Sequence, residues 1–194
     1  METQINGRKY RTIKEDLKPY FAGLYGGDQH MSTKGLSRYG CGSVTLNTYA
    51  VYKDRAKHTK EELTEKQDAM FRKYLLGPTS ALRFKLAAIL YYRLRGQNAR
   101  VKITHGLIES GDGLKKMMRD IVRNIDNDNP VPLIMGMLVQ KGYKDHLDNH
   151  WVTITGYSDD YMVLVSNNGR QEELSLRDLA RKRLFIATAA ITLE

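Results

Sequence analysis

The sequence predicts an α+β fold in which a helical N-terminal half packs on a C-terminal antiparallel β-sheet. Two observations predict it. Apolar residues recur at three- and four-residue spacing through the first two thirds of the chain, as in helices that bury one face. From Pro130 the period changes, and short runs rich in branched and aromatic residues follow one another, as in strands. Helices first and strands afterwards are typical of an α+β protein.

The length of the chain favours one domain. Its 194 residues can bury one substantial core but are short for two. We therefore expect a single domain over 1–194, with a helical half at about 1–128 and a sheet half at about 129–194. Hydrophobic residues make up 41% of the chain, which is typical of a globular protein and not of a disordered one.

Capping patterns predict three of the helices. A Thr-x-x-Glu pattern at 12–15 predicts a short helix that ends near Tyr20. The same pattern at 59–62 predicts a helix that runs to about Leu76, where a Gly-Pro pair stops it. Ser175, three residues before Asp178, predicts a small helix among the strands.

Apolar periodicity predicts three more helices. Segment 43–52 should form a largely buried helix directly after Cys41. A second helix should start at Thr79 or Ser80 and end at Gly96, with these side chains toward the interior: Leu82, Ala87, Leu90, Tyr91 and Leu94. A third should follow Asp112, with these residues on its apolar face: Leu114, Met117, Met118, Ile121, Val122 and Ile125.

Four runs in the last third predict strands, at 133–139, 151–157, 161–165 and 184–193. The glycines at 23–27 predict a loop before the first long helix. That loop lacks a following Lys-Ser or Lys-Thr pair, so it does not match a phosphate-binding loop.

The charge of the chain indicates which kinds of partner it can bind. The net charge of +9 allows an acidic partner, but the basic residues are interleaved with acids and apolar positions along helices. No zinc-finger spacing or RNA-stacking motif occurs, so nucleic-acid binding is disfavoured.

The longest apolar run, 131–139, is too short to span a membrane, and the N-terminus has no apolar signal core. One cysteine cannot form an internal disulfide, and a cytoplasmic protein is expected.

Cys41 is the candidate nucleophile because it lies between two glycines where the first long helix begins. Free amide groups and the dipole at a helix N-terminus favour the thiolate and should lower its pKa below the free value of about 8.5. A lone cysteine is more often a small buried hydrophobe. Here the flanking glycines and the helix start favour the reactive interpretation.

His150 is the candidate general base and acid because it opens a strand that can hold its ring rigidly beside a cleft. A polar turn at 166–169 follows the next strand and can supply the residue that orients the imidazole. Metal binding is a weaker alternative: His146 and His150 flank Asp148, but the segment does not look helical and no motif places a third ligand. We expect neither a metal nor a cofactor.

Three sequence blocks carry a family resemblance. They are GGDQ at 26–29 with YGCGSV at 39–44, HWVTITGY at 150–157, and VSNNGR at 165–170 leading to LSL at 174–176. With these blocks the chain resembles the papain-like cysteine peptidase superfamily, specifically bacterial proteins similar to the double-glycine peptidases that trim bacteriocin leaders. The resemblance implies a papain-like fold with Cys41 at the start of the central helix and His150 on the facing sheet.

The resemblance also implies the rest of the site. Gln29 should form the oxyanion hole with the backbone amide of Cys41. It precedes the cysteine by twelve residues, farther than in papain, so an intervening loop is needed. Asn167 is the favoured partner of the histidine, with Ser166 and Asn168 as alternatives. Asn168 also replaces the tryptophan that commonly precedes the glycine of this turn.

The implied function is a cysteine-dependent hydrolase, peptidase- or amidase-like, that forms an acyl-enzyme on Cys41. Its substrate would be a peptide or another acyl-containing molecule. An acyltransferase using the same cysteine, a non-catalytic papain-like binding protein, and a basic nucleic-acid-binding protein are the alternatives. The sequence does not specify the substrate or the oligomeric state.

Overall fold

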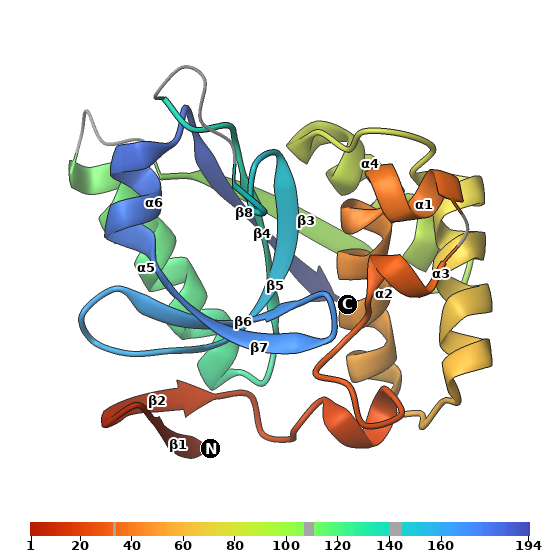
Figure 1. Cartoon of the computed structure of the whole chain (residues 1–194), viewed down its shortest axis with the longest axis horizontal. Coiled ribbons are helices and arrows are strands. Elements are labelled where there is room, and N and C mark those ends of the chain that lie inside the picture. The colour runs from red at the N-terminus through yellow and green to blue at the C-terminus, as the bar shows by residue number, and fades with distance from the viewer. Residues whose placement is uncertain (33, 107–110, 140–144) are drawn as a thin grey trace.

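A sheet with helices on both faces makes up the computed structural model, which describes residues 1–32, 34–106, 111–139 and 145–194 (Figure 1). The strands are β1 (Glu2–Ile5), β2 (Arg8–Thr12), β3 (Ala99–His105), β4 (Val131–Met135), β5 (His150–Tyr157), β6 (Met162–Asn167), β7 (Arg170–Ser175) and β8 (Ile186–Leu193). The α-helices are α1 (Lys34–Tyr39), α2 (Cys41–Asp54), α3 (Lys60–Tyr74), α4 (Ala81–Arg93), α5 (Gly111–Asp126) and α6 (Leu176–Lys182). Two short 3₁₀ turns, η1 (Lys18–Tyr20) and η2 (Gln29–Met31), lie in the N-terminal segment.

Strand β5 is the centre of the sheet. It pairs with β4 over 150–154, with β2 at 156–157 and with β6 over 153–157. From β4 the sheet continues through β8 to β3, and from β6 to β7, and these pairs are all antiparallel. All eight residues of β5 are buried, so its first residue, His150, is held by packing on both sides.

Two hydrophobic cores lie on the two faces of the sheet. Helices α5 and α6 cover one face and α2, α3 and α4 cover the other (Figure 1). In the second core Phe84 of α4 stacks on Trp151 of β5 with ring centroids 4.2 Å apart. Helix α2 contributes Val51 to one core and Leu46 to the other, which buries it along most of its length. Each such large apolar side chain stabilises the fold by about 1.5–3 kcal/mol.

The α+β class and most helices match the sequence expectations. The predicted buried helix after Cys41 is α2, and the helix after Asp112 is α5. Thr59 and Glu62 form a complete capping box at the start of α3, and Ser80 and Ser175 cap α4 and α6. The four predicted strands are present as β4, β5, β6 and β8, with ends that differ by a few residues.

The predicted helix from Thr12 to Tyr20 is wrong. Thr12 is the last residue of β2, and its backbone amide donates to the carbonyl of Met1 at 2.8 Å. Only the single turn η1 is helical in this stretch. A Thr-x-x-Glu pattern can cap a helix only if the threonine is free of the sheet, and here pairing with neighbouring backbone takes precedence.

The inward face predicted for α4 is also wrong for three of its leucines. Leu82 is 65% exposed and Leu94 68%, and Leu90 is exposed as well. The buried side of the helix is instead formed by Phe84, Ala87, Ala88 and Tyr92. Among the predicted inward residues, Ala87 is buried and Tyr91 is partly buried.

Four strands were not predicted. Strands β1, β2 and β3 precede residue 128, where helices and loops were expected, and β7 follows the turn after Asn167. Polar and apolar residues alternate in β3, and β1 and β3 are edge strands of the sheet. None of the helices in the described ranges combines the length and the apolar character needed to cross a bilayer.

Candidate active site

Cys41 is the first residue of α2, and glycines on both sides allow the chain to approach its neighbours closely. A Cβ on Gly42 would come within 2.8 Å of the Thr79 side chain, which precedes α4. A Cβ on Gly40 would collide with the carbonyl of Leu36 in α1. The Gly-Cys-Gly sequence is therefore required for the helix start to pack against α1 and the residues that lead into α4.

The sulfur of Cys41 lies against the first residues of β5. Its Sγ is 3.9 Å from the carbonyl oxygen of Asn149, and the backbone amide of Trp151 is directed at it from the other side of His150. Backbone amides of Gly42 and of Cys41 itself also face the sulfur. These three amides lie where they can stabilise negative charge at the start of α2.

The expected low pKa of the thiol is not what the structure gives. Burial raises the pKa of Cys41 above its usual value, and the amides of Trp151, Gly42 and Cys41 offset this only in part. Burial likewise lowers the pKa of the His150 imidazole, against the hydrogen bond that the ring makes to Asn167, which raises it. Both shifts favour a neutral thiol and a neutral imidazole at rest.

His150 has one ring nitrogen fixed by a hydrogen bond. Its Nε2 lies 2.8 Å from Oδ1 of Asn167, the last residue of the neighbouring strand β6. The ring is 6% exposed. Because Asn149, just before it, has a positive φ of 50°, the chain turns sharply into β5 at this point.

Glu172 of β7 fixes which way the Asn167 amide points. Nδ2 of Asn167 donates to both carboxylate oxygens of Glu172, at 3.1 and 3.2 Å. A carboxylate only accepts, so the amide nitrogen faces Glu172 and the amide oxygen faces the ring of His150. The ring nitrogen Nε2 must then carry the hydrogen, which leaves Nδ1 as the unprotonated, basic nitrogen.

The two alternative partners of the histidine have other contacts. The hydroxyl of Ser166 donates to the carbonyl of Tyr25 at 2.6 Å. Asn168 and Gly169 have φ of 44° and 74° and form the tight turn between β6 and β7. Of the three candidates, Asn167 is the one whose side chain is hydrogen-bonded to His150.

Gln29 lies in η2, on a loop tied to the same region. The amide of Gly169 donates to the carbonyl of Gly27 at 2.9 Å, and the amide of Gly27 donates to Thr48 of α2. The six residues of α1 occupy much of the spacing between Gln29 and Cys41. Among the described residues, Oε1 of Gln29 is buried without a hydrogen-bond partner.

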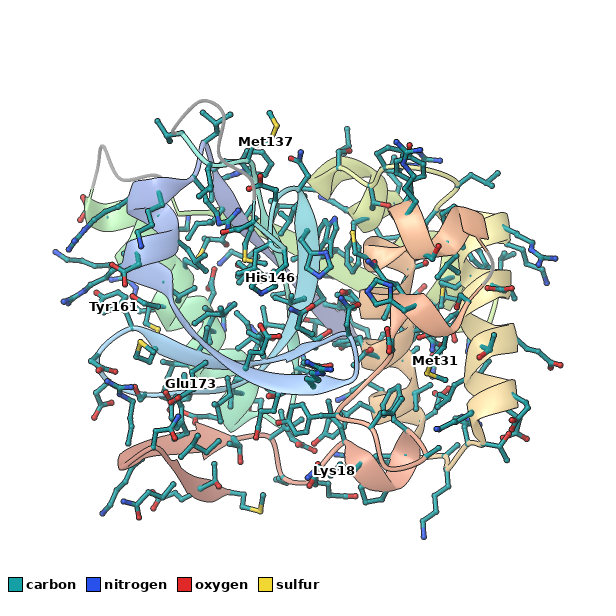
Figure 2. All side chains as sticks on the ribbon, in the orientation of Figure 1. Lys18, Met31, Met137, His146, Tyr161 and Glu173 are labelled. Atoms are coloured by element: carbon teal, nitrogen blue, oxygen red, sulfur yellow. The ribbon has the colours of Figure 1, made fainter. Side chains whose placement is uncertain are left out.

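His146, the other histidine of the metal-binding alternative, lies beside Glu172. Its Nε2 lies 3.6 Å from a carboxylate oxygen of Glu172, and its side chain is 69% exposed. Figure 2 shows His146 in front of the sheet, above the β6–β7 hairpin. Within the described ranges, no three His, Cys, Asp or Glu residues lie close enough to hold a metal ion.

Glu172 was missed by the sequence analysis, although a signal for it exists. Asn168-Gly169 directly after the branched run of β6 is a strong hairpin pattern, and the hairpin sets Val165 opposite Glu172. The neighbouring Glu173 points the other way, and accepts a hydrogen bond from Tyr10 of β2. Figure 2 shows Glu173 between β7 and the β1–β2 hairpin.

The chain has a distant structural similarity to a known protein. No protein-family model matches the chain, and no curated protein matches it by sequence. One solved structure that overlaps it is a double-glycine motif protease from an AMS/PCAT transporter in complex with the leader peptide, at 14% identity. The match covers 78% of this chain and 84% of that chain, with a TM-score of 0.41. An overlap of this size assigns neither fold nor function, which rest on the residues described above.

Proposed function

We propose that the chain is a papain-like cysteine hydrolase that attacks an acyl carbonyl with the sulfur of Cys41. The observation that carries the proposal is the hydrogen-bonded chain from Glu172 through Asn167 to His150, next to the helix start that holds Cys41. This chain gives the imidazole one defined tautomer with a basic Nδ1. The substrate class is a peptide or another molecule with an amide, ester or thioester bond.

The proposed reaction begins with transfer of the thiol proton of Cys41 to Nδ1 of His150 as the sulfur attacks the substrate carbonyl carbon. The tetrahedral oxyanion accepts hydrogen bonds from the Cys41 amide and from the side-chain amide of Gln29. When it collapses, the imidazolium returns the proton to the leaving amine, alcohol or thiol. Water, deprotonated by Nδ1, then attacks the thioester carbonyl and releases the acid and the free thiol.

A site in which the Cys41 thiol and the His150 imidazole are both neutral at rest predicts a defined pH dependence of the reaction rate. His150 must be unprotonated to accept the thiol proton, and burial lowers its pKa below the ordinary histidine value. The acid limb of the rate profile should therefore lie below about pH 6.5. Above this limb the imidazole is available as a base throughout the neutral range.

The test combines an electrophilic probe with a panel of acyl substrates. We expect a peptidyl chloromethyl ketone to label Cys41 of the wild-type protein, detected by mass. Labelling should be lost in Cys41→Ala and slowed at least about a hundredfold in His150→Ala, in line with the usual effect of a general base. His105→Ala is the matched control, because His105 is an exposed histidine on β3.

Labelling of Cys41 no faster than that of a free thiol, together with unchanged turnover in Cys41→Ala, would contradict the proposal. A non-catalytic binding protein with this fold would label no faster than a free thiol and would turn over no substrate. The raised pKa of the thiol and the lowered pKa of the imidazole are the observations in its favour. Added amine or thiol acceptors separate an acyltransferase from a hydrolase, because only the former partitions its acyl-enzyme to the acceptor in preference to water.

A further inference from the structure

A basic cavity lies at the opposite end of α2 from Cys41. Its volume is about 390 Å³, and it is bordered by Lys53 of α2, by β3 and α5, and by the last residues of β8. Figure 1 shows the C-terminus of the chain beside α2. Lys53 is twelve residues after Cys41, which at 1.5 Å per residue separates the two by about 18 Å along the helix. A ligand here would not occupy the candidate active site.

Three cations from three elements line this cavity: Lys53 of α2, Lys102 of β3 and Arg123 of α5. Among the described residues, one carboxylate, that of Asp120, pairs with two of them. It lies 2.8 Å from Nζ of Lys102 and 3.1 Å from the guanidinium of Arg123. Within the ion pairs of the described residues, one carboxylate thus meets three cations, which leaves an excess of two positive charges.

Lys53 is the cation with the least compensation. Its Nζ donates to the backbone carbonyl of Asp128 at 3.4 Å, and in the described ranges it forms no ion pair within 4 Å. The carboxylate of Asp128 is engaged by Arg55 and by the backbone amide of Lys14. Burial lowers the pKa of Lys53, and the nearby charge of Asp128, which raises it, offsets this only in part.

The floor of the cavity is a fixed network of amides. Nδ2 of Asn129 donates to Oδ1 of Asn124 at 2.8 Å and to the carbonyl of Ile191 at 2.6 Å. The hydroxyl of Tyr49 donates to Oδ1 of Asn129 at 2.7 Å. Because these groups satisfy one another, the three cations are the charged groups of the cavity that remain to bind a ligand.

We propose that this cavity binds a small phosphorylated molecule, with its phosphoryl group held by Lys53, Lys102 and Arg123. A phosphoryl dianion matches the excess of two positive charges, and an arginine fork with two lysines is a common way of binding one. The cavity volume is at the lower end of the range for small-molecule sites, which leaves room for an attached organic group. The bound anion would link α2 on one face of the sheet with α5 on the other.

The test measures thermal unfolding and ³¹P line broadening with inorganic phosphate and with glycerol phosphate, at constant ionic strength set by chloride. At a tenfold excess over Kd we expect the Tm to rise by roughly 3 to 6 °C. Lys53→Met and Arg123→Met should each weaken binding at least tenfold. Lys57→Met and Arg119→Met are charge-matched controls outside the cavity, and should bind as the wild type does.

The two ligands distinguish the source of the phosphoryl group. Tighter binding of glycerol phosphate supports a phosphorylated metabolite, and equal binding supports free phosphate. The absence of both the Tm shift and the line broadening would overturn the proposal. The proposal would also be overturned if Arg119→Met weakened phosphate binding as much as Arg123→Met does. Tight binding of an oligonucleotide, weakened alike by all four variants, would overturn it as well. The same measurements on Cys41→Ala keep the result independent of whether the chain is an enzyme.

Discussion

Replacing Glu172 tests how the imidazole of His150 is held in one tautomer. Its carboxylate accepts from Nδ2 of Asn167 at 3.1 and 3.2 Å, and it contacts neither the sulfur nor the ring of His150 by a hydrogen bond among those described. In Glu172→Ala the Asn167 amide is free to rotate by 180°. Its nitrogen would then face Nε2 and favour the tautomer that has its hydrogen on Nδ1, which cannot accept the thiol proton.

The magnitude follows from the hydrogen bonds lost. Bonds to a charged group contribute about 1.5–3 kcal/mol, and because the Glu172 side chain is 30% exposed we take the lower end. A free-energy difference of about 1.4 kcal/mol between the two tautomers of His150 changes their ratio about tenfold. Glu172→Ala should therefore slow acylation of Cys41 about tenfold. Glu172→Gln keeps an oxygen acceptor for Asn167, and should slow the reaction by about threefold or less.

Removing the charge of Glu172 also shifts the pH profile. Its carboxylate raises the pKa of His150, although burial, the larger effect, lowers it. Without that charge the pKa of His150 falls further, so the basic form persists to lower pH. The acid limb of the profile should move to lower pH in both Glu172→Gln and Glu172→Ala.

The assay is the rate of Cys41 labelling by a peptidyl chloromethyl ketone between pH 4 and 9, read by mass, with ¹⁵N shifts of His150 to report the tautomer. Glu173→Gln is the control, because that side chain points toward Tyr10 on the other side of the hairpin. If Glu172→Ala keeps the wild-type rate, acid limb and Nε2–H tautomer, Glu172 does not position Asn167. If Glu173→Gln has the same effect as Glu172→Gln, the effect comes from the loss of a negative charge in this region and not from the contact with Asn167.

Two further predictions concern stability. Gly42→Ala places a Cβ within 2.8 Å of Thr79, so the free energy of unfolding by urea should fall by about 1–3 kcal/mol; an unchanged midpoint would show that Thr79 moves away without cost. Burial opposes ionisation of Asp128, yet hydrogen bonds from Tyr52 and the charge of Arg55 hold its pKa below the usual value. Its contribution to stability is therefore present above about pH 4 and is lost as the pH falls through the lower, folded-state pKa. The free energy of unfolding of the wild type should fall in this acidic range, and that of Asp128→Asn should fall less. An equal fall with pH in both proteins would refute this.

The helices were largely predictable because their signals are local. Thr59 with Glu62 and Ser80 form caps within a single turn, and the apolar stripe of α5 repeats over four turns. Strands β2 and β3 are different, because each also depends on pairing with a distant segment, whereas β1 pairs with the adjacent β2. β3, for example, pairs with β8, about ninety residues later in the chain.

The face of α4 shows a limit of periodicity. Leucines recur every four residues from Leu82 to Leu94, and a second row with the same spacing contains Phe84, Ala88 and Tyr92. Either row satisfies a helical pattern. The structure buries the second row because Phe84 stacks on Trp151, and the sequence does not state where Trp151 will lie.

Cys41 and His150 were selected from sequence because each begins an element, and such positions are visible in a single chain, whereas Asn167 was favoured, ahead of Ser166 and Asn168, by the family resemblance. The contact from Asn167 to Glu172 was not visible in this way, because it crosses a hairpin whose second strand was not predicted. The hairpin pattern Asn168-Gly169 contained that information. A two-residue turn of this type fixes the register of both flanking strands, so the sequence pattern alone suffices to place Glu172 near Asn167.

The ionisation of Cys41 depends on burial, which is a property of the whole fold. A helix start and nearby amides favour the thiolate, and the sequence shows both. Desolvation by the packing around α2 and β5 acts in the opposite direction and is larger. A cysteine that rests as a thiol resists oxidation and random alkylation, since the thiolate is the reactive form. Its proton must then leave during the attack itself, which makes the basic Nδ1 of His150, and hence the orientation of Asn167, a requirement of the proposed chemistry.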